Sequence, residues 1–471
     1  MTTGVSEPAG SAWATATTSG RPLRVAVVGA GPAGFYTVEA LLKRKDVDVD
    51  VDLFERLPAP YGLLRYGVAP DHPKIKSVSV AYDRLCEDPR VRFFGNVHVG
   101  RGLAVSDLLA CYDQVVFATG CETDRRIGVP GEELAGSLSA TAFVAWYNGH
   151  PEYRSLPVDL STERVVVVGI GDVAMDLARI LLRNPDDLAN TDIADYALAA
   201  LRTSRVREVV ILARRGPRQA AFAAKELEDI AELPGVGVSV DRDQVTHDLE
   251  TVDPHHGTER HKLEVLAAIA DAGDGGARRR LEIRFLASPA AILGEGGRTA
   301  AIRIQHNELI RSASSDVVAR GTGRYETIPC GLVLRSVGYR GLPLAGLPFD
   351  EERGIIANAG GRVLDGGVIV PGLYVSGWIK RGATGVVGTN KGDAAATVAN
   401  MLEDAATTPA RDAASVSRGA IDRVLGERGI RVVTWDGWKR IDRVERERGA
   451  ATGKVREKLT DIEACLEAAG V

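Results

Sequence analysis

The sequence predicts a doubly wound α/β fold that is built twice within one chain. Two segments carry this prediction, RVAVVGAGPAGFYTVEALLKR at residues 24–44 and RVVVVGIGDVAMDLARILLR at residues 164–183. Each begins as a continuous apolar stretch, passes through a turn broken by glycines and continues with a helical pattern. A strand that is buried on both faces of a parallel sheet has such an unbroken apolar pattern. Strands and helices alternate after each segment, which favours parallel sheets covered by helices.

The first unit shows its elements in a regular order. A buried strand at 25–28 leads into a helix with an apolar inner side, and a second strand, DVDLF, ends next to Glu55. After a loop at 56–72 come a helical stretch and a strand near VRFFGNVHV. The stretch YDQVVFATG then reads as a buried strand that Gly120 ends.

The second unit begins with a strand at Val165. A loop and a short helix are expected at 184–204, followed by the strand EVVILARRG. Residues 240–330 alternate in the manner of antiparallel strands, and GLVLRSVGYRG closes the unit. Beyond it, GLYVSGW predicts one more buried strand that leads to the helix KGDAAATVANML. The charged, amphipathic segment from about residue 411 is expected to pack outside the core.

The first glycine turn has the spacing of a dinucleotide-binding site. Gly29, Gly31 and Gly34 fit G-x-G-x-x-G directly after a strand and before a helix. This pattern provides a tight turn, a close backbone approach to a pyrophosphate and free N–H groups at the helix start. Glu55 stands where a carboxylate accepts hydrogen bonds from a ribose hydroxyl and repels a 2′-phosphate. We therefore expect this site to bind FAD or NAD rather than NADP.

The second glycine turn has the opposite charge beside it. It reads Gly169-x-Gly171-x-x-Ala174, and alanine is allowed in the third place. Arg214 and Arg215 follow the next strand, where the first unit has its acidic residue. Two guanidinium groups offer forked donors to a phosphate, so this site is expected to select NADP(H). Two dinucleotides with opposite ribose preferences indicate hydride transfer between NADPH and a flavin.

These assignments define the predicted domains. We expect two dinucleotide-binding Rossmann-like domains, with the NADP domain inserted into the FAD domain in a glutathione-reductase-like architecture. The predicted boundaries are a disordered tail at 1–22, an FAD-binding domain at 23–123 and 338–471, and an NADP-binding domain at 124–337. The first 20 residues lack the basic start and apolar middle of a secretory signal, so a cytoplasmic protein is expected.

Composition argues against several functional classes. The net charge of −5 is too small to predict a nucleic-acid partner, and no apolar run is long enough to predict a membrane span. The five cysteines are scattered and form no C-x-x-C pair. This argues against a zinc site, an iron–sulfur cluster or a dithiol redox centre, so no metal is expected. The thiols are expected to be buried and inert.

Longer motifs resemble one enzyme family. PYGLLRYGVAPDHPKIK at 60–76 and GWIKRGATGVVGTNK at 377–391 are similar to the signature segments of adrenodoxin-reductase-like ferredoxin–NADP reductases. The stretches GVPGEELAGSLSA and RRGPRQAAFAAKEL and the terminal TWDGWKRIDRVERERGAATGKVREKL resemble the same family. The resemblance implies a monomeric, FAD-dependent NADPH:ferredoxin oxidoreductase. In such an enzyme, hydride would pass from NADPH to bound FAD. Single electrons would then pass from the flavin to a ferredoxin, an acidic iron–sulfur protein. A cytochrome P450 or another oxygenase is a candidate acceptor further downstream.

The resemblance also implies which positions contact the cofactors. Beside the glycines of the first turn, the implied FAD contacts are Ala33, Glu55, Leu63, Val99, Trp378, Gly385, Val386 and Val387. The implied NADP contacts are Arg125, Ile170, Gly171, Asp172, Val173, Arg214, Arg215, Glu226 and Gly385. The stretch TGVVG leads into a helix, whose N–H groups can stabilise a reduced, anionic flavin ring.

One stretch departs from the family pattern. The family has G-[NQ]-G-N-V in the second turn, whereas this chain has G-I-G-D-V. Ile170 lacks a side-chain amide, and Asp172 is expected to place a carboxylate near the pyrophosphate. We therefore expect weaker NADP(H) binding than in a relative with asparagine there, and the preference for NADPH over NADH stays open.

His72 and Glu226 are the predicted catalytic residues. By the resemblance they lie near the stacked rings, where they could move or balance a proton or orient the nicotinamide amide. The alternative is that His72 only caps the turn made by Asp71 and Pro73. Hydride transfer itself needs no essential acid or base.

An acidic ferredoxin predicts a basic docking face. The candidates are Lys74, Lys76, Arg205, Arg207 and Arg218.

Other classes of flavoprotein share parts of this pattern. A disulfide reductase needs a cysteine pair, which is absent, and a flavin monooxygenase needs a substrate pocket that the sequence does not reveal. A glutamate-synthase-type NADPH electron-transfer flavoprotein shares both turns but normally carries cysteine-ligated clusters. It stays an alternative, as does a nucleotide-binding redox sensor without turnover.

Overall fold

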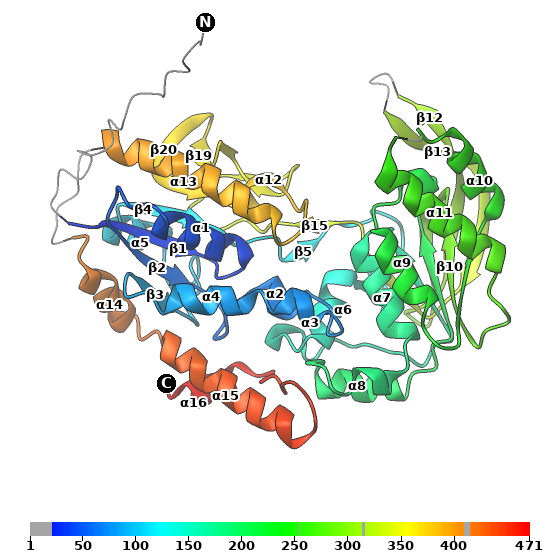
Figure 1. Cartoon of the computed structure of the whole chain (residues 1–471), viewed down its shortest axis with the longest axis horizontal. Coiled ribbons are helices and arrows are strands. Elements are labelled where there is room, and N and C mark those ends of the chain that lie inside the picture. Colours follow the sequence, from blue (N-terminus) through cyan, green and yellow to red (C-terminus); the bar gives the residue numbers. More distant parts are fainter. Residues whose placement is uncertain (1–20, 254, 313–315, 409–414) are drawn as a thin grey trace, which may run out of the picture.

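The computed structural model describes residues 21–253, 255–312, 316–408 and 415–471. These residues form two α/β units that lie side by side (Figure 1). The predicted disordered tail at 1–22 lies outside the described residues except for its last two, of which Arg21 forms an ion pair with Asp113.

The first unit surrounds a sheet whose described strands run in the order β18-β19-β20-β4-β1-β2-β3. The parallel strands are β20 (Val368–Val375), β4 (Gln114–Phe117), β1 (Leu23–Val28), β2 (Val49–Phe54) and β3 (Val91–Phe94). The antiparallel strands β19 (Arg362–Asp365) and β18 (Asn358–Ala359) extend one edge. Val25, Ala26 and Val27 have no exposed surface, as their continuous apolar run predicts.

Helices cover both faces of this sheet. One face packs against α1 (Pro32–Leu42), α4 (Ser79–Cys86) and α13 (Thr389–Thr407). The other packs against α5 (Val105–Cys111) and α14 (Arg418–Glu427). The β1–turn–α1 connection therefore lies at the carboxyl edge of a central strand, where doubly wound sheets bind their ligands.

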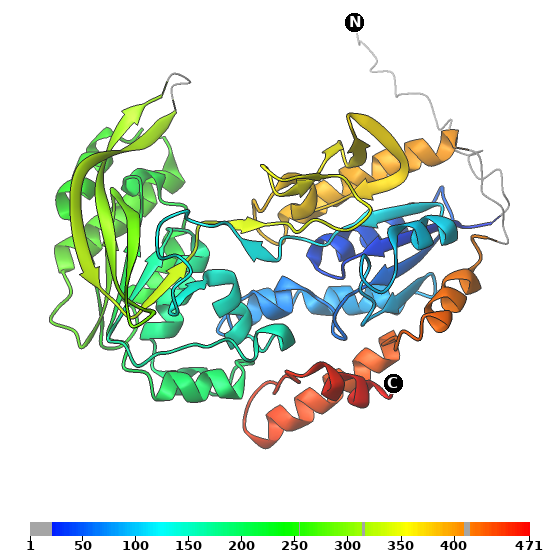
Figure 2. The same ribbon diagram turned by 180° about the vertical axis from the view of Figure 1, so that it is seen from behind.

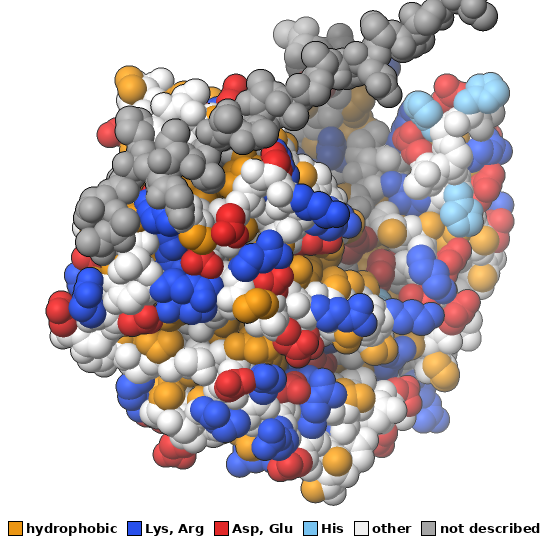
Figure 3. Space-filling view, turned by 60° about the vertical axis from the view of Figure 1, so that its left-hand side comes forward, with side chains coloured by type: hydrophobic (Ala, Val, Ile, Leu, Met, Phe, Trp, Pro, Cys, Tyr) orange, Lys and Arg blue, Asp and Glu red, His pale blue; other side chains and the backbone are white. Residues whose placement is uncertain are grey.

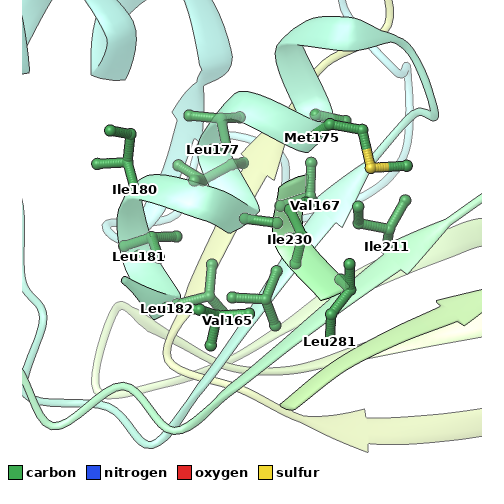
Figure 4. Close-up of a cluster of buried hydrophobic side chains, with 14 of the residues drawn as sticks. Val165, Val167, Met175, Leu177, Ile180, Leu181, Leu182, Ile211, Ile230 and Leu281 are labelled. Atoms are coloured by element: carbon green, nitrogen blue, oxygen red, sulfur yellow. The ribbon is translucent and has the colours of Figure 1, made fainter. Parts of the chain in front are cut away.

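The second unit has a parallel sheet of its own. Its described strands are, in order, β6 (Ser137–Ser139), β14 (Leu332–Arg335), β7 (Arg164–Val168), β8 (Glu208–Leu212), β10 (Arg279–Arg284) and β9 (Val236–Val240). The apolar side chains of α7 (Asp172–Leu182) pack on one face of it (Figure 4). Also part of this layer are α6 (Ala140–Tyr147), α8 (Asp195–Arg202), α9 (Ala224–Ala231), α10 (Arg242–Thr251) and α11 (Gly257–Ala272).

An antiparallel sheet covers the opposite face of the second unit. It contains β11 (Ala287–Glu295), β12 (Arg298–Arg311) and β13 (Val317–Pro329). Ile292, Ile302 and Ile304 of this sheet pack against Val166 and Val210 of the parallel sheet. The fold class predicted from the sequence, two Rossmann-like units with one inserted into the other, is confirmed.

Along the part of the chain that the structure describes, the two passages between the units lie at a short ribbon. β5 (Thr123–Asp124) pairs antiparallel with β15 (Tyr339–Arg340), and Figure 2 shows this ribbon from behind as it crosses between the units. The domain boundaries predicted from the sequence fall beside the ribbon. The exact residue at which each domain begins and ends stays a prediction.

Residues 240–330 differ from their prediction. Most of 242–272 is helical, and only the strands from β11 onward are antiparallel, since β10 joins the parallel sheet. The pattern was misleading because β10 buries Leu281 and Ile283 while its intervening side chains stay partly exposed. Apolar and polar residues alternate along any half-exposed strand, whether its neighbours run parallel or antiparallel to it.

The C-terminal segment also differs from its prediction. Besides α14, it contains α15 (Trp435–Ala451) and α16 (Ile462–Ala469). It was expected outside the core, yet Trp438, Ile441 and Leu466 are buried in the cluster that covers the first sheet. One face of each helix therefore completes the core, and the charged face remains outside.

All five cysteines lie in the described ranges, and each is buried and unbonded, as predicted. Among the described residues, no helix is long and apolar enough to cross a membrane.

Candidate functional site

The first turn, formed by Gly29, Gly31 and Gly34, leaves its middle glycine facing open space. Gly29 has a φ of +107°, and a Cβ there would lie 2.5 Å from the carbonyl oxygen of Ala118. A Cβ on Gly34 would collide with the carbonyl oxygen of Gly29. A Cβ on Gly31 would meet no protein atom closer than 4.0 Å, at Gly62. The fold therefore requires the outer two glycines, whereas the middle one provides room for a ligand.

The N-terminus of α1 adds free donors to this space. Gly31 at its N-cap has no side chain to cap the helix, and no acidic residue lies in its first turn. The backbone N–H groups at the helix start can therefore donate to an anion.

Glu55 lies beside the first turn, directly after β2. Its Oε2 accepts a hydrogen bond from the N–H of Ala30 at 3.0 Å, and its Oε1 accepts one from the N–H of Leu57 at 3.1 Å. Only 9% of its surface is exposed, and this burial raises the pKa of its carboxyl group. The predicted ribose acceptor is thus held rigidly at the edge of the turn.

The segment 60–67 crosses the first turn, which sequence reasoning did not derive. The N–H of Tyr61 donates to the carbonyl of Ala30 at 2.7 Å, and Tyr61 adopts a φ of +86° that side chains rarely adopt. Its hydroxyl binds the Asp83 carboxylate and accepts a hydrogen bond from Trp438 Nε1 at 3.1 Å. These contacts explain why the PYG stretch accompanies the glycine turn.

The second turn repeats the geometry of the first. Gly169 has a φ of +118°, and a Cβ there would collide with the carbonyl oxygen of Ser336. A Cβ on Gly171 would meet nothing within 4 Å, and Ala174 is fully buried. The space over Gly171 is therefore the counterpart of the space over Gly31.

Asp172 is the first residue of α7, at the edge of the second turn. Its Oδ1 accepts a hydrogen bond from the N–H of Ala223 at 2.9 Å, and burial raises the pKa of its carboxyl group. The N–H of Ala221 donates to the carbonyl of Ile170 at 3.0 Å. Asp172 and Ile170 thus hold the loop before α9 against the turn.

Two arginines beyond β8 carry free guanidinium groups. Arg214 is exposed and Arg215 is half-buried, and within the described residues neither guanidinium contacts a hydrogen-bond acceptor or a carboxylate. Arg218 nearby is engaged by Glu259 at 2.6 Å. The pair at 214–215 is therefore available for an anionic ligand.

The segment 377–388 lies against the first turn. A Cβ on Gly377 would collide with the side chain of Ala33, and the Gly377 N–H donates to Asp393 at 2.6 Å. Trp378 begins α12 (Trp378–Arg381), and its Nε1 donates to the carbonyl of Thr384 at 3.1 Å. The predicted flavin contacts Gly385 to Val387 follow, and Val386 is 68% exposed.

His72 lies in a charged cluster between the two units. Its Nε2 is 3.2 Å from Asp176 Oδ1, 3.7 Å from Glu226 Oε2 and 2.6 Å from Arg179 Nη2. Arg179 is 1% exposed and also contacts Asp71 at 2.7 Å, Glu226 at 2.7 Å and Asp176. His72 does occupy the N-cap position of the short helix at 73–76, but its side chain makes no capping hydrogen bond and lies in this cluster instead.

Charge pairing in this cluster favours a protonated imidazole. Hydrogen bonding to Asp176 and Glu226 raises the pKa of His72 to about 9, and His72 and Arg179 lower the pKa of Glu226. A neutral Nε2 would instead accept from Arg179, so the proton decides which partner His72 binds. His72, Asp176 and Glu226 lie close enough together to be possible metal ligands. The Arg179 guanidinium lies among them, however, so the positive charge that a metal ion would bring is already supplied by Arg179.

A pocket of about 400 Å³ opens beside this cluster. Its lining includes Asp71, His72, Arg179 and Arg183 from the cluster region and Glu232 from the end of α9. Asp176 and Arg179, which sequence reasoning missed, lie three positions apart on α7, whose other residues after Asp172 are apolar. A charged pair on the core-facing side of a helix is the signal that could have identified them.

The other predicted positions are more dispersed. Leu63 begins α2 (Leu63–Tyr66) beside the first turn, Val99 is buried next to Leu103, and Val173 lies on α7. The N–H of Arg125 donates to the carbonyl of Gly338, beside the β5–β15 ribbon.

The predicted basic face needs a correction. Lys76 is mostly buried, and its Nζ lies 2.6 Å from Asp192 of the second unit, so it is not on a docking surface. On the face in Figure 3, Lys and Arg side chains alternate with Asp and Glu and form no single basic patch. Lys74, by contrast, is exposed.

Known proteins share this architecture along most of the chain. The family model described as pyridine nucleotide-disulphide oxidoreductase matches residues 23–262. The NADPH-ferredoxin reductase FprA of Mycobacterium tuberculosis is 44% identical over 451 residues, which cover 94% of this chain and 98% of that protein. The mitochondrial NADPH:adrenodoxin oxidoreductase of Homo sapiens is 41% identical over 95% of this chain and 92% of its own length.

A solved structure agrees with these sequence matches. The structure of Mycobacterium tuberculosis FprA in complex with NADPH superposes with a TM-score of 0.90 and 43% identity, covering 96% of this chain and all of that one. The chain therefore belongs to the pyridine nucleotide-disulphide oxidoreductases and, among them, to the adrenodoxin-reductase-like ferredoxin–NADP reductases.

Proposed function

We propose that the chain is an FAD-dependent NADPH:ferredoxin oxidoreductase. The observation that carries this proposal is the presence of two open glycine turns, one with an acidic side chain beside it and the other in the unit that presents two arginines. Gly31 faces space bordered by Glu55, whereas Gly171 belongs to the unit that presents Arg214 and Arg215. An acidic border suits the free ribose of FAD, and an arginine border suits the 2′-phosphate of NADPH.

The residues of each turn fit the group proposed for it. The N–H groups at the start of α1 would hold the FAD pyrophosphate, Glu55 would accept from the ribose, and Trp378 with the 385–387 backbone would border the flavin. The start of α7 would hold the NADP pyrophosphate. When bound, FAD supplies the ability to take a hydride from NADPH and to release electrons singly.

The charged cluster between the units would hold the nicotinamide in place. Arg179 fixes Glu226 through its contact at 2.7 Å, and the carboxylates of Asp176 and Glu226 lie 3.2 and 3.7 Å from His72 Nε2, so both side chains are oriented before a ligand enters. His72 in its protonated form can hold a proton next to the reacting rings, and Glu226 can accept from the nicotinamide amide.

We propose an acidic iron–sulfur ferredoxin as the electron acceptor, because the relatives named above are ferredoxin and adrenodoxin reductases. Lys74, Arg205, Arg207 and Arg218 stay candidate docking residues. The cytoplasmic location and the monomeric state predicted from the sequence stay proposals, as does an oxygenase further downstream.

The proposal is tested by cytochrome c reduction with NADPH, with and without added ferredoxin. We expect turnover that depends on the ferredoxin. A redox sensor would show almost no turnover under either condition, and a glutamate-synthase-type subunit would gain nothing from the ferredoxin.

The pH dependence of the free energy of unfolding should reveal the stabilising contribution of the protonated His72 side chain. Its folded pKa of about 9 lies above the ordinary value near 6.5, so the stabilising contribution is complete below about pH 6.5 and is lost as the pH rises through 9. We expect the wild type to lose about 2 kcal/mol more than His72→Gln between pH 6 and 10, after allowance for partial solvent screening. Denaturant unfolding at several pH values measures this, and parallel curves for both proteins would contradict it.

Asp172→Asn should tighten NADP binding. Asparagine keeps an oxygen that can accept from the N–H of Ala223 but removes a negative charge from the edge of the second turn. We expect the dissociation constant of NADP+ to fall by about threefold to tenfold, the scale of a charge effect at a helix terminus. Calorimetric titration measures it, and an unchanged constant would show that the carboxylate does not act on the nucleotide.

A further inference from the structure

A buried carboxylate joins the two units at a second place, where its partner Lys76 follows His72 of the charged cluster by four residues. Asp192 precedes α8 and is 6% exposed. Its carboxylate accepts from Lys76 Nζ at 2.6 and 2.8 Å and lies 2.9 Å from Lys458 Nζ. Lys76 ends α3 (Pro73–Lys76) and Lys458 lies between α15 and α16, so both lysines belong to the first unit. We name these three residues the Asp192 clamp.

Backbone contacts reinforce the clamp. The N–H of Val455 donates to the carbonyl of Asn190 at 3.1 Å, and Lys454 Nζ donates to the carbonyl of Ile193 at 2.6 Å. Lys454 also contacts Asp195 at 2.6 Å. The loop before α8 is therefore held along its length by the segment that follows α15.

The same C-terminal segment is tied to the proposed FAD site. Glu445 of α15 is fully buried, accepts from the N–H of Leu459 at 2.9 Å and pairs with Arg65 and Arg456. The carbonyl of Arg65 in turn accepts from Lys458 Nζ at 3.3 Å. Arg65 belongs to the segment that crosses the first turn, so a continuous set of contacts runs from that turn to the second unit.

Electrostatics makes this contact hard to break. Lys76 and Lys458 lower the pKa of the Asp192 carboxyl, so it stays charged, while burial lowers the pKa of both lysines. Removal of the Asp192 charge would leave two buried lysines uncompensated, which is strongly unfavourable, whereas removal of Lys76 leaves Asp192 paired with Lys458 but loses the two Lys76 contacts across the units. Such a contact holds its partners in one relative position.

Contacts of this kind decide the relative position of the units, because the covalent connection is slender. The chain crosses between the units only at β5 and β15 within the described residues, where two residue pairs form the ribbon. In Figures 1 and 2 the ribbon and the C-terminal segment lie at opposite ends of the junction. The clamp therefore restrains the end that the ribbon leaves free.

We propose that Lys76, Asp192 and Lys458 are positioning residues that set the approach of the nicotinamide to the flavin. This inference rests on the proposed function. Hydride transfer requires reacting atoms about 3–3.5 Å apart, and a misplacement of about 1 Å can lower the rate by about 100-fold. A loosened clamp would leave both nucleotide turns intact but disturb the distance between their ligands.

The test uses the holoenzyme with Lys76→Met and Asp192→Asn. We expect the limiting rate of flavin reduction at saturating NADPH to fall by about tenfold or more, while the dissociation constant of NADP+ changes less than about twofold. Hydrogen exchange of the amides at 190–195 and 454–459 should accelerate, which reports the loosening independently of activity. Lys76→Met leaves Asp192 paired with Lys458, so it provides the decisive result if Asp192→Asn does not fold.

Two control variants separate the clamp from general effects. Lys76→Arg keeps the cation and should keep the rate, and Asp186→Asn removes an exposed pair with Arg202 in the same region and should change nothing. Faster exchange with an unchanged reduction rate in Lys76→Met would overturn the proposal. If NADPH does not reduce the flavin of the wild type, the proposed function itself is refuted. If the wild type is reduced and the variants have the same reduction rate, only the proposal for the clamp is refuted.

Discussion

Gly31→Val should yield a folded protein without bound flavin. Gly31 has extended backbone with a φ of −86°, and a Cβ there meets no protein atom closer than 4.0 Å, so the fold accommodates the side chain. The new side chain instead fills the space that the FAD pyrophosphate would occupy over the N-terminus of α1. Two lost hydrogen bonds to a charged group correspond to about 3–6 kcal/mol, or about 100-fold to 10,000-fold weaker FAD binding.

The chain offers a matched control for this change. Gly171→Val places the same side chain in the second turn, where a Cβ also meets nothing within 4 Å. It should leave the flavin bound and weaken NADPH binding instead. Flavin content after gel filtration and NADP+ affinity by calorimetry measure the two effects. Equal flavin loss in both variants, or none in Gly31→Val, would contradict the assignment of FAD to the first turn.

Arg214→Gln and Arg215→Gln should convert the second site from NADPH towards NADH. Neither guanidinium has a carboxylate partner within the described residues, so both are available for the 2′-phosphate. A hydrogen bond to a charged group contributes about 1.5–3 kcal/mol. Each substitution should therefore raise the KM for NADPH by about tenfold to 100-fold and change the KM for NADH less than about twofold.

Arg205→Gln is the control for this pair. Arg205 precedes β8, at the opposite end of the strand from Arg214, and it lies 3.7 Å from Glu163. Its loss should change neither KM. If the KM for NADPH rises as much in Arg205→Gln as in Arg215→Gln, the effect is one of overall charge and not of a phosphate site.

Local sequence patterns were sufficient to predict the two glycine turns. Backbone geometry that only glycine adopts, as at Gly29 and Gly169, leaves a direct mark on the sequence. The apolar runs of β1 and β7 were equally informative, because both strands are covered on both faces. The order of strands and helices then followed from these units.

Contacts between distant segments could not be predicted in this way. Lys76 was predicted to be a docking residue because the sequence shows only its neighbours in the chain. Its ion-pair partner Asp192 lies 116 positions away and leaves no mark near Lys76. Arg179 and Asp71, 108 positions apart, were missed for the same reason. The helices α10 and α11 were missed because they bury few side chains, Val245, Leu263 and Leu266, so their apolar periodicity is weak.

The central claim is that one chain brings a resident flavin and a visiting NADPH together. Anaerobic titration of the purified protein with NADPH, followed by absorption spectroscopy, tests it most directly. The protein should be yellow, should bleach with about one equivalent of NADPH because one hydride reduces one flavin, and should regain its colour when oxidised ferredoxin is added. A colourless protein, or a yellow one that NADPH does not bleach without air, would contradict the account.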